Sequence, residues 1–209
     1  MKFYDCATAP SPRRVRIFIA EKGLDIPTVQ VDLRSGEHLK DDFRAINPHA
    51  TVPVLELADG TRLLDSTSIS IYLDEAFPEP NLMGRDAREK AIIAGWNRTV
   101  EWDGLAAAAE CLRNSAKGMK GRAITGPVSY QQIPELAERG RQRARHFLSD
   151  LNDRLGESEY VAGDRFTIAD ITAVVAVDFM KWIKEEGPED AMGLKRWYES
   201  VSARPGIVV

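Results

Sequence analysis

The first eighty residues alternate short apolar runs, which have the period of β-strands, with stretches whose apolar positions follow helical spacing. The pattern predicts strands at residues 2–6, 28–33, 54–57 and 62–64, and helices at 15–22, 39–46 and from Ser66 onward. Gly23 follows the first of these helices, where a glycine commonly ends one. An Ala-Asp-Gly turn joins the last two strands and is typical of a β-hairpin. The order is therefore β-α-β-α-β-β-α, an α/β domain with a mixed four-stranded sheet over residues 1–80.

The pattern changes where two prolines near residue 80 interrupt it, and residues 81–87 are predicted to be a linker. Beyond the linker, apolar residues keep helical spacing in four segments, 92–100, 136–155, 171–182 and 194–201. Residues 118–134 are rich in Gly and Pro and predict a loop or lid between helices. Residues 88–209 are thus predicted to form an all-α domain.

The start of one of these helices has a capping motif. Thr167 stands three residues before Asp170, so each side chain is expected to bond the backbone of the other. The cap alone contributes about 1 kcal/mol to stability. We interpret this motif as structural, so that its loss is expected to damage folding and not chemistry.

Composition narrows the class of protein. Apolar residues make up 44% and charged residues 29% of the 209, and the net charge of -4 argues against a nucleic-acid partner. No stretch approaches the roughly 20 apolar residues that cross a bilayer, and because the first residues turn polar at once we expect no secretory leader. Cys6 and Cys111 match neither a CxxC nor a zinc spacing. We therefore expect no membrane, no metal and a reducing cytoplasm.

Four stretches stand in order along the chain: SPRRVRIFIAEKGL (11–24), INPHATVPVLELADGTRLLDSTSISIYLDE (46–75), YVAGDRFTIADI (160–171) and RWYESVSARP (196–205). Together they resemble the cytosolic glutathione transferase family, in its bacterial form, over nearly the whole chain. The resemblance implies a thioredoxin-like first domain, glutathione as co-substrate and a homodimer. It also implies transfer of the glutathione thiolate to a hydrophobic electrophile, or its use to reduce a peroxide or disulfide.

Val52-Pro53 precedes a predicted strand, where a trans proline would disrupt pairing. A cis bond at this position would turn the backbone N–H and C=O of Val52 toward solvent. The resemblance implies that these groups pair, strand-like, with the cysteinyl part of glutathione. The alternative from the residues alone is a plain loop that contains a proline.

Asp65-Ser66 lies at the start of the third predicted helix, where unpaired N–H groups and the helix dipole favour an anion. A ligand carboxylate could bind these groups and the Ser66 hydroxyl, and Asp65 could meet a ligand ammonium. A γ-glutamyl group carries both charges. Ser66 is also expected to cap the helix, and most relatives of this type have Glu where Asp65 stands.

By resemblance, His38 and Thr51 bind the glycine end of glutathione, although a lone surface histidine is more often uninvolved in binding.

A free thiol has a pKa near ~8.5, so a hydroxyl that stabilises the thiolate is the expected catalytic group. The position of the family's active Ser or Cys falls on Ala9, which cannot donate. Ser11 is the first candidate and Thr8 the second, and a backbone amide is a third possibility. The alternative for Ser11 is a helix cap ahead of Pro12 at the first helical position. Tyr4 is a weak candidate, because a strand tyrosine is usually buried.

Three functions compete on these observations. The leading one is a glutathione transferase with a small hydrophobic electrophile as second substrate. A dedicated glutathione lyase or isomerase would use the same fold. A non-catalytic binding or interaction protein that has kept the fold is the third, favoured by Ala9 and opposed by Val52-Pro53 and Asp65-Ser66.

Overall fold

The computed structural model describes residues 1–208 of the chain, which divides into two compact units. The first unit contains residues 1–80 with 124–128, and the second contains 81–123 with 129–208. The elements of the first unit are β1 (Lys2–Asp5), α1 (Pro10–Glu21), β2 (Thr28–Gln30), the 3-10 helix η1 (Glu37–Leu39), α2 (Asp41–Ile46), β3 (Val54–Glu56), β4 (Arg62–Leu63) and α3 (Ser66–Ala76).

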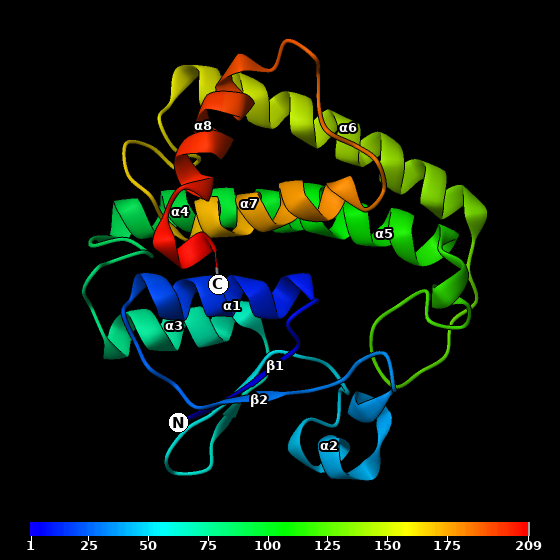
Figure 1. The fold of residues 1–209 in the computed structure, drawn as a ribbon. Helices are drawn as coiled ribbons and strands as arrows, with labels where there is room; N and C mark the ends of the chain where they lie inside the picture. Colours follow the sequence, from blue (N-terminus) through cyan, green and yellow to red (C-terminus); the bar gives the residue numbers. More distant parts are fainter. Residues whose placement is uncertain (209) are drawn as a thin grey trace. The chain divides into compact units, whose positions relative to one another are not determined.

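The four strands form one mixed sheet in the order β2-β1-β3-β4. Strand β1 is parallel to β2 and antiparallel to β3, and β3 is antiparallel to β4. Tyr4 and Val54 pack with Phe43 of α2 in one apolar cluster. Alternation along a strand turns their neighbours Phe3 and Leu55 to the opposite face, where α1 and α3 lie side by side (Figure 1). The predicted thioredoxin-like sheet is confirmed.

Several element boundaries of the first unit differ from the prediction, two of them by three residues or more. The strand expected at 28–33 ends at Gln30, because Asp32 Oδ1 accepts bonds from the backbone N–H groups of Arg34 and Ser35 and turns the chain. The first helix begins at Pro10 and not at residue 15, since a proline needs no hydrogen-bond acceptor at the first helical position. The apolar pattern alone could not detect that first turn.

The second unit is helical, as predicted. Its elements are α4 (Ala87–Thr99), the π-helical segment η2 (Val100–Leu105), α5 (Ala106–Ser115), η3 (Lys117–Met119), α6 (Pro134–Glu157), α7 (Ile168–Lys181), α8 (Met192–Ser202) and η4 (Pro205–Ile207). All but two of the 14 residues of α7 are buried, so this helix is the centre of the unit's core. Between α5 and α6 the chain forms the predicted loop.

Helices α5 and α6 approach closely at Gly140. A Cβ atom at this position would lie 2.6 Å from the backbone N of Cys111 and 2.8 Å from the carbonyl O of Ala107. Only a glycine fits so near another helix backbone. Cys111 is fully buried and packs as a small apolar residue, and this burial raises the pKa of its thiol.

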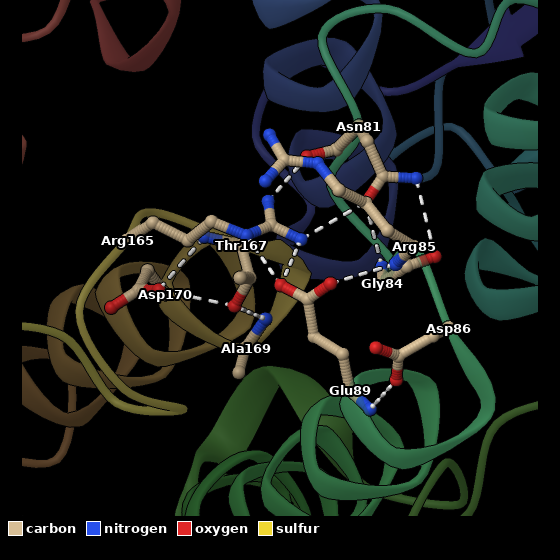
Figure 2. Close-up of polar contacts among 9 residues, drawn as sticks. All are labelled: Asn81, Gly84, Arg85, Asp86, Glu89, Arg165, Thr167, Ala169 and Asp170. Carbon is tan, nitrogen blue, oxygen red and sulfur yellow. Dashed lines mark hydrogen bonds and ion pairs between the residues drawn. The ribbon is translucent and has the colours of Figure 1, made fainter.

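The start of α7 contains the predicted capping box (Figure 2). Thr167 Oγ1 accepts a bond from the N–H of Ala169 at 3.3 Å, and Asp170 Oδ2 accepts one from the N–H of Thr167 at 2.9 Å. Asp170 Oδ1 also accepts bonds from Val161 N and Trp197 Nε1, both at 2.9 Å. The carboxylate therefore joins α7 to the preceding loop and to α8.

The segment that precedes α4 is bonded into the second unit. Arg165 donates to the side chain and backbone oxygens of Asn81 and to Glu89, while Glu89 accepts a bond from the N–H of Arg85 at 2.7 Å (Figure 2). Asp86 caps α4 through the N–H of Glu89. Residues 81–86 are thus ordered by hydrogen bonds.

Within residues 1–208, no helix has the length and apolar composition needed to span a bilayer. Over the same residues, His, Cys, Asp and Glu side chains nowhere gather in a group that could bind a metal ion.

Candidate functional site

Three segments of the first unit meet at one end of its sheet. Strands β3 and β4 pair with Leu55 opposite Leu63, and the same register continued outward brings residue 53 opposite residue 65. Strands β1 and β3 pair with Tyr4 opposite Val54, and that register brings residue 6 opposite residue 52. The predicted ligand residues near 52 and 65 and the loop with the candidate hydroxyls therefore lie at the same sheet end.

The Val52-Pro53 peptide bond is cis, as expected. Among residues 1–208, neither the backbone N–H nor the C=O of Val52 has a hydrogen-bond partner. Asn47, which is fully buried, donates from Nδ2 to the carbonyl and hydroxyl oxygens of Thr51 at 2.8 and 3.0 Å. The side chain of Asn47 thus orders the segment that presents Val52, whose open backbone groups could pair with an extended ligand.

At the next segment the cap of α3 is Asp65 and not Ser66, so the prediction for Ser66 is wrong. Asp65 Oδ1 accepts bonds from the N–H groups of Thr67 and Ser68, both at 2.9 Å, and its backbone is extended. Ser66 is the first helical residue instead, and its N–H has no partner among the residues that the structure describes. Both of these cap bonds use Oδ1, and Asp65 is exposed.

A buried guanidinium stands beside the start of α3. Arg14 of α1 is 6% exposed and its Nη1 donates to Ser66 Oγ at 3.5 Å. The positive charge, the N–H of Ser66 and the helix dipole all favour an anion at this point. Asp65 beside them favours a cation, so the pair suits a group that has both charges.

The N-terminus of α1 is the third segment. Ala9 is its cap residue, with no side-chain bond, so the alternative that Ser11 caps the helix with Pro12 at the first position is wrong. Pro10 and Pro12 have no N–H, and the N–H of Arg13 bonds to the carbonyl of Ala9 at 3.2 Å. In the described chain the N–H of Ser11 is therefore the one unsatisfied backbone donor of this first turn. Ser11 is half-buried, and its hydroxyl is a second possible donor.

The other candidates are placed as follows. Thr8 is exposed and its Oγ1 lies 3.6 Å from the sulfur of Cys6, which is buried. Tyr4 is buried edge-on against Phe43, as expected of a core tyrosine. His38 belongs to η1, ahead of α2, and is only 6% exposed, so it is not the surface histidine that the sequence suggested.

Sequence reasoning missed Arg14 and the contacts of Asn47. Arg14 precedes Phe18 by one helical turn and shares the apolar face of α1, and a charged residue on such a face is the signal that could have found it. Asn47 belongs to the stretch 46–75 that carries the family resemblance, but the sequence assigned no role to its side chain. Its bonds depend on the tight turn after α2, which has no pattern in the sequence.

The chain matches two family models, "Glutathione S-transferase, N-terminal domain" over residues 8–76 and "Glutathione S-transferase, C-terminal domain" over residues 108–205. Glutathione S-transferase 2 of Saccharomyces cerevisiae is 36% identical over 99% of this chain and 88% of its own length. Maleylacetoacetate isomerase of Pseudomonas aeruginosa is 39% identical over 45% of this chain and 47% of its own length.

Solved structures agree with these relatives. A glutathione S-transferase domain-containing protein of Marinobacter aquaeolei superposes with a TM-score of 0.91 at 40% identity, covering 99% of this chain and all of that one. Gtt2 of Saccharomyces cerevisiae superposes with a TM-score of 0.90 at 36% identity, covering 100% of this chain and 99% of that one. The chain is therefore a glutathione transferase, a member of the glutathione S-transferase family in both its domains.

Proposed function

We propose that glutathione binds at the sheet end described above, with its γ-glutamyl group at Asp65 and Ser66 and its cysteinyl backbone along Val52 and Pro53. The observation that carries this proposal is the register of β3 and β4, which brings residue 53 opposite residue 65. If the cysteinyl part of glutathione pairs with the backbone of Val52, its γ-glutamyl group lies near the N-terminus of α3. His38 and Thr51 are proposed for the glycine end.

The chemistry proposed is addition of the glutathione thiolate to a small hydrophobic electrophile. The thiol loses its proton, the sulfur forms a bond to an electrophilic carbon, and a leaving group or a double bond takes the electron pair. Ser11 donates from its hydroxyl, its backbone N–H or both to the thiolate, helped by the α1 dipole. Thr8 is the second candidate. Reduction of a peroxide or disulfide by the same thiolate is an alternative reaction.

Truncated ligands test the proposed orientation. Calorimetry would compare glutathione with Cys-Gly, which lacks the γ-glutamyl group, and with γ-Glu-Cys, which lacks glycine. Cys-Gly should bind at least about 30-fold more weakly, because several charge-assisted bonds disappear together. γ-Glu-Cys should lose less than Cys-Gly. Equal affinity for Cys-Gly and glutathione would contradict the site.

Two other functions have specific support. The match to maleylacetoacetate isomerase over 45% of the chain favours a dedicated glutathione-dependent isomerase. Ala9 at the cap of α1, where no side chain can donate, favours a binding protein without catalysis. A panel of electrophiles, peroxides and cis-unsaturated diketo acids distinguishes these functions, since a binding protein turns over none of them.

We also propose a homodimer in the cytoplasm. The exposed apolar side chain of Ile71 on α3 and that of Trp102 in the helical unit, 50% and 56% exposed, are candidates for burial between copies. Both cysteines are free thiols, as in a reducing compartment. Sedimentation that shows only a 23.3 kDa species at micromolar concentration would refute the dimer.

A further inference from the structure

Residues 6–9 connect β1 to α1 without regular secondary structure, and they include Thr8 and the cap residue of α1. Such a loop is normally mobile, because few of its backbone groups are bonded. Here two side chains from neighbouring elements bind its backbone directly. Arg16 Nη2 donates to the carbonyl of Ala7 at 3.0 Å, and Gln30 Oε1 accepts a bond from the N–H of Ala7 at 2.9 Å.

The two side chains share one buried anchor. Asp5, the last residue of β1, is fully buried, and its Oδ1 accepts a bond from Arg16 Nη1 at 2.6 Å. Its Oδ2 accepts a bond from Gln30 Nε2 at 2.7 Å. Arg16 Nη1 also reaches the carbonyl of Cys6 at 3.3 Å. The carboxylate thus fixes both an arginine from α1 and a glutamine from β2, and these fix Ala7 from two directions.

We propose that Arg16 and Gln30 are positioning residues for the thiolate, which act by holding residues 6–9 and thereby the donors of Thr8 and Ser11. This inference rests on the proposed function, since it concerns the same sheet end. Neither residue needs to touch glutathione. The planar guanidinium of Arg16 contacts three oxygens at once, which a lysine ammonium could not do in the same geometry.

Position matters more here than the strength of one bond. A single hydroxyl or amide donor stabilises the thiolate only at hydrogen-bond distance, and a displacement of about 1 Å can cost up to about a hundredfold in rate. If the loop moves, the bound thiol should ionise at higher pH although the glutathione peptide still binds. A change in thiol ionisation without a change in peptide affinity is therefore the expected result of disturbing this network.

The test uses Gln30→Ala, because Gln30 is exposed on an edge strand and its loss should leave the fold intact. Thr28→Val is the matched control, since Thr28 lies on the same strand and its hydroxyl donates to the carbonyl of Ile26, away from residues 6–9. Gln30→Ala should lower kcat near neutral pH by about 3- to 10-fold and raise the pH at which bound glutathione forms its thiolate absorbance. Affinity for S-methylglutathione, which has no thiol, should stay within about twofold. Thr28→Val should change none of these.

Arg16→Lys gives a second measurement, because it keeps a charge beside Asp5 but loses the bridge to Ala7 and Cys6. It should shift thiol ionisation in the same direction as Gln30→Ala, and amide exchange at Ala7 should accelerate in both variants. An unchanged thiol titration in Gln30→Ala, with wild-type protein that does bind glutathione, would overturn the positioning role alone. Wild-type protein that fails to bind glutathione would overturn the proposed function and this inference together.

Discussion

The N-termini of α3 and α7 are both capped by side chains, and an aspartate accepts backbone hydrogen bonds at each. The two helix starts differ in how completely the protein satisfies their N–H groups. At α7 the capping residues are buried, and Asp170 accepts bonds from Thr167, Val161 and Trp197, so its donors are all internal. At α3 the capping carboxylate of Asp65 is exposed and the N–H of Ser66 finds no partner in the described chain. A helix start that the protein satisfies completely stabilises the fold, whereas one left partly unsatisfied at a sheet end is available to a ligand.

The largest effect is expected on stability, at the N-terminus of α7, where the protein satisfies every N–H group. Asp170→Ala should lower the free energy of unfolding by about 3 kcal/mol or more, because several buried N–H groups lose their acceptor at once. Urea unfolding followed by circular dichroism measures this loss. Asp164→Ala, an exposed acid in the preceding loop, is the control and should stay within about 0.5 kcal/mol. A loss below about 1 kcal/mol for Asp170→Ala would show that the hydrogen bonds to Asp170 do not stabilise the fold together, beyond what a single helix cap contributes.

At the N-terminus of α3, a substitution of Asp65 should change the affinity for glutathione more than the stability of the fold. Asp65→Asn keeps a good capping side chain but removes the charge that would meet the ligand ammonium. Glutathione affinity by calorimetry should fall more than about tenfold, with stability nearly unchanged. Asp65→Ala should lose both affinity and about 1 kcal/mol of stability. Unchanged affinity in folded Asp65→Asn would remove this residue from the site and weaken the contrast between the two helices.

A smaller effect is expected at Ser11 of α1. Ser11→Ala should lower turnover at neutral pH by about 3- to 30-fold and raise the pKa of the bound thiol, with the loss shrinking at high pH. Stability should hold, because Ser11 does not cap the helix. Thiolate absorbance against pH decides the point. A titration curve that does not move would assign activation to the Ser11 backbone N–H or to Thr8, and Thr8→Val would follow.

The smallest effect concerns the segment before α4. The hydrogen bond from Arg165, then that from the N–H of Arg85, lowers the pKa of Glu89 below its ordinary value of 4.5. A carboxyl group with a lowered pKa in the folded protein stabilises the fold at any pH above its ordinary pKa. This stabilisation is lost as the pH falls through the lowered pKa. Glu89→Gln should therefore flatten the acid side of the stability curve. Because Glu89 is 30% exposed, the difference at neutral pH should be under about 1 kcal/mol. An identical acid limb in both proteins would contradict this contribution.

The order of elements followed from the sequence because apolar periodicity and turn residues are local signals. The hairpin, the cis Val52-Pro53 bond and the Thr167–Asp170 capping box were all predictable in this way. The α1 start was not, since its first turn contains two prolines and no apolar stripe. The choice between Asp65 and Ser66 as cap was also missed, because adjacent residues of equal capping preference differ only in backbone angle.

The sequence predicted the candidate ligand-binding residues of the site. It did not predict the residues that hold the neighbouring loop in place. Val52 and Asp65 belong to short motifs, so their positions could be identified. Asp5, Arg16 and Gln30 are distant in sequence and meet only after β1, α1 and β2 have assembled. Such long-range polar contacts leave no periodic trace in a single sequence.

The register that brings residue 53 opposite residue 65 also restricts which changes of chain length the protein can tolerate. The exposed turn at residues 58–60, where Gly60 has a positive φ of 86°, lies at the far end of the hairpin from the site. A peptide tag inserted there would lengthen the tip and leave the pairing of β3 with β4 unchanged. One residue inserted within β4 would instead move Asp65 out of line with Pro53 and reverse the faces of the strand. The hairpin tip is thus a suitable place to graft an affinity label or a fluorophore without altering the ligand end.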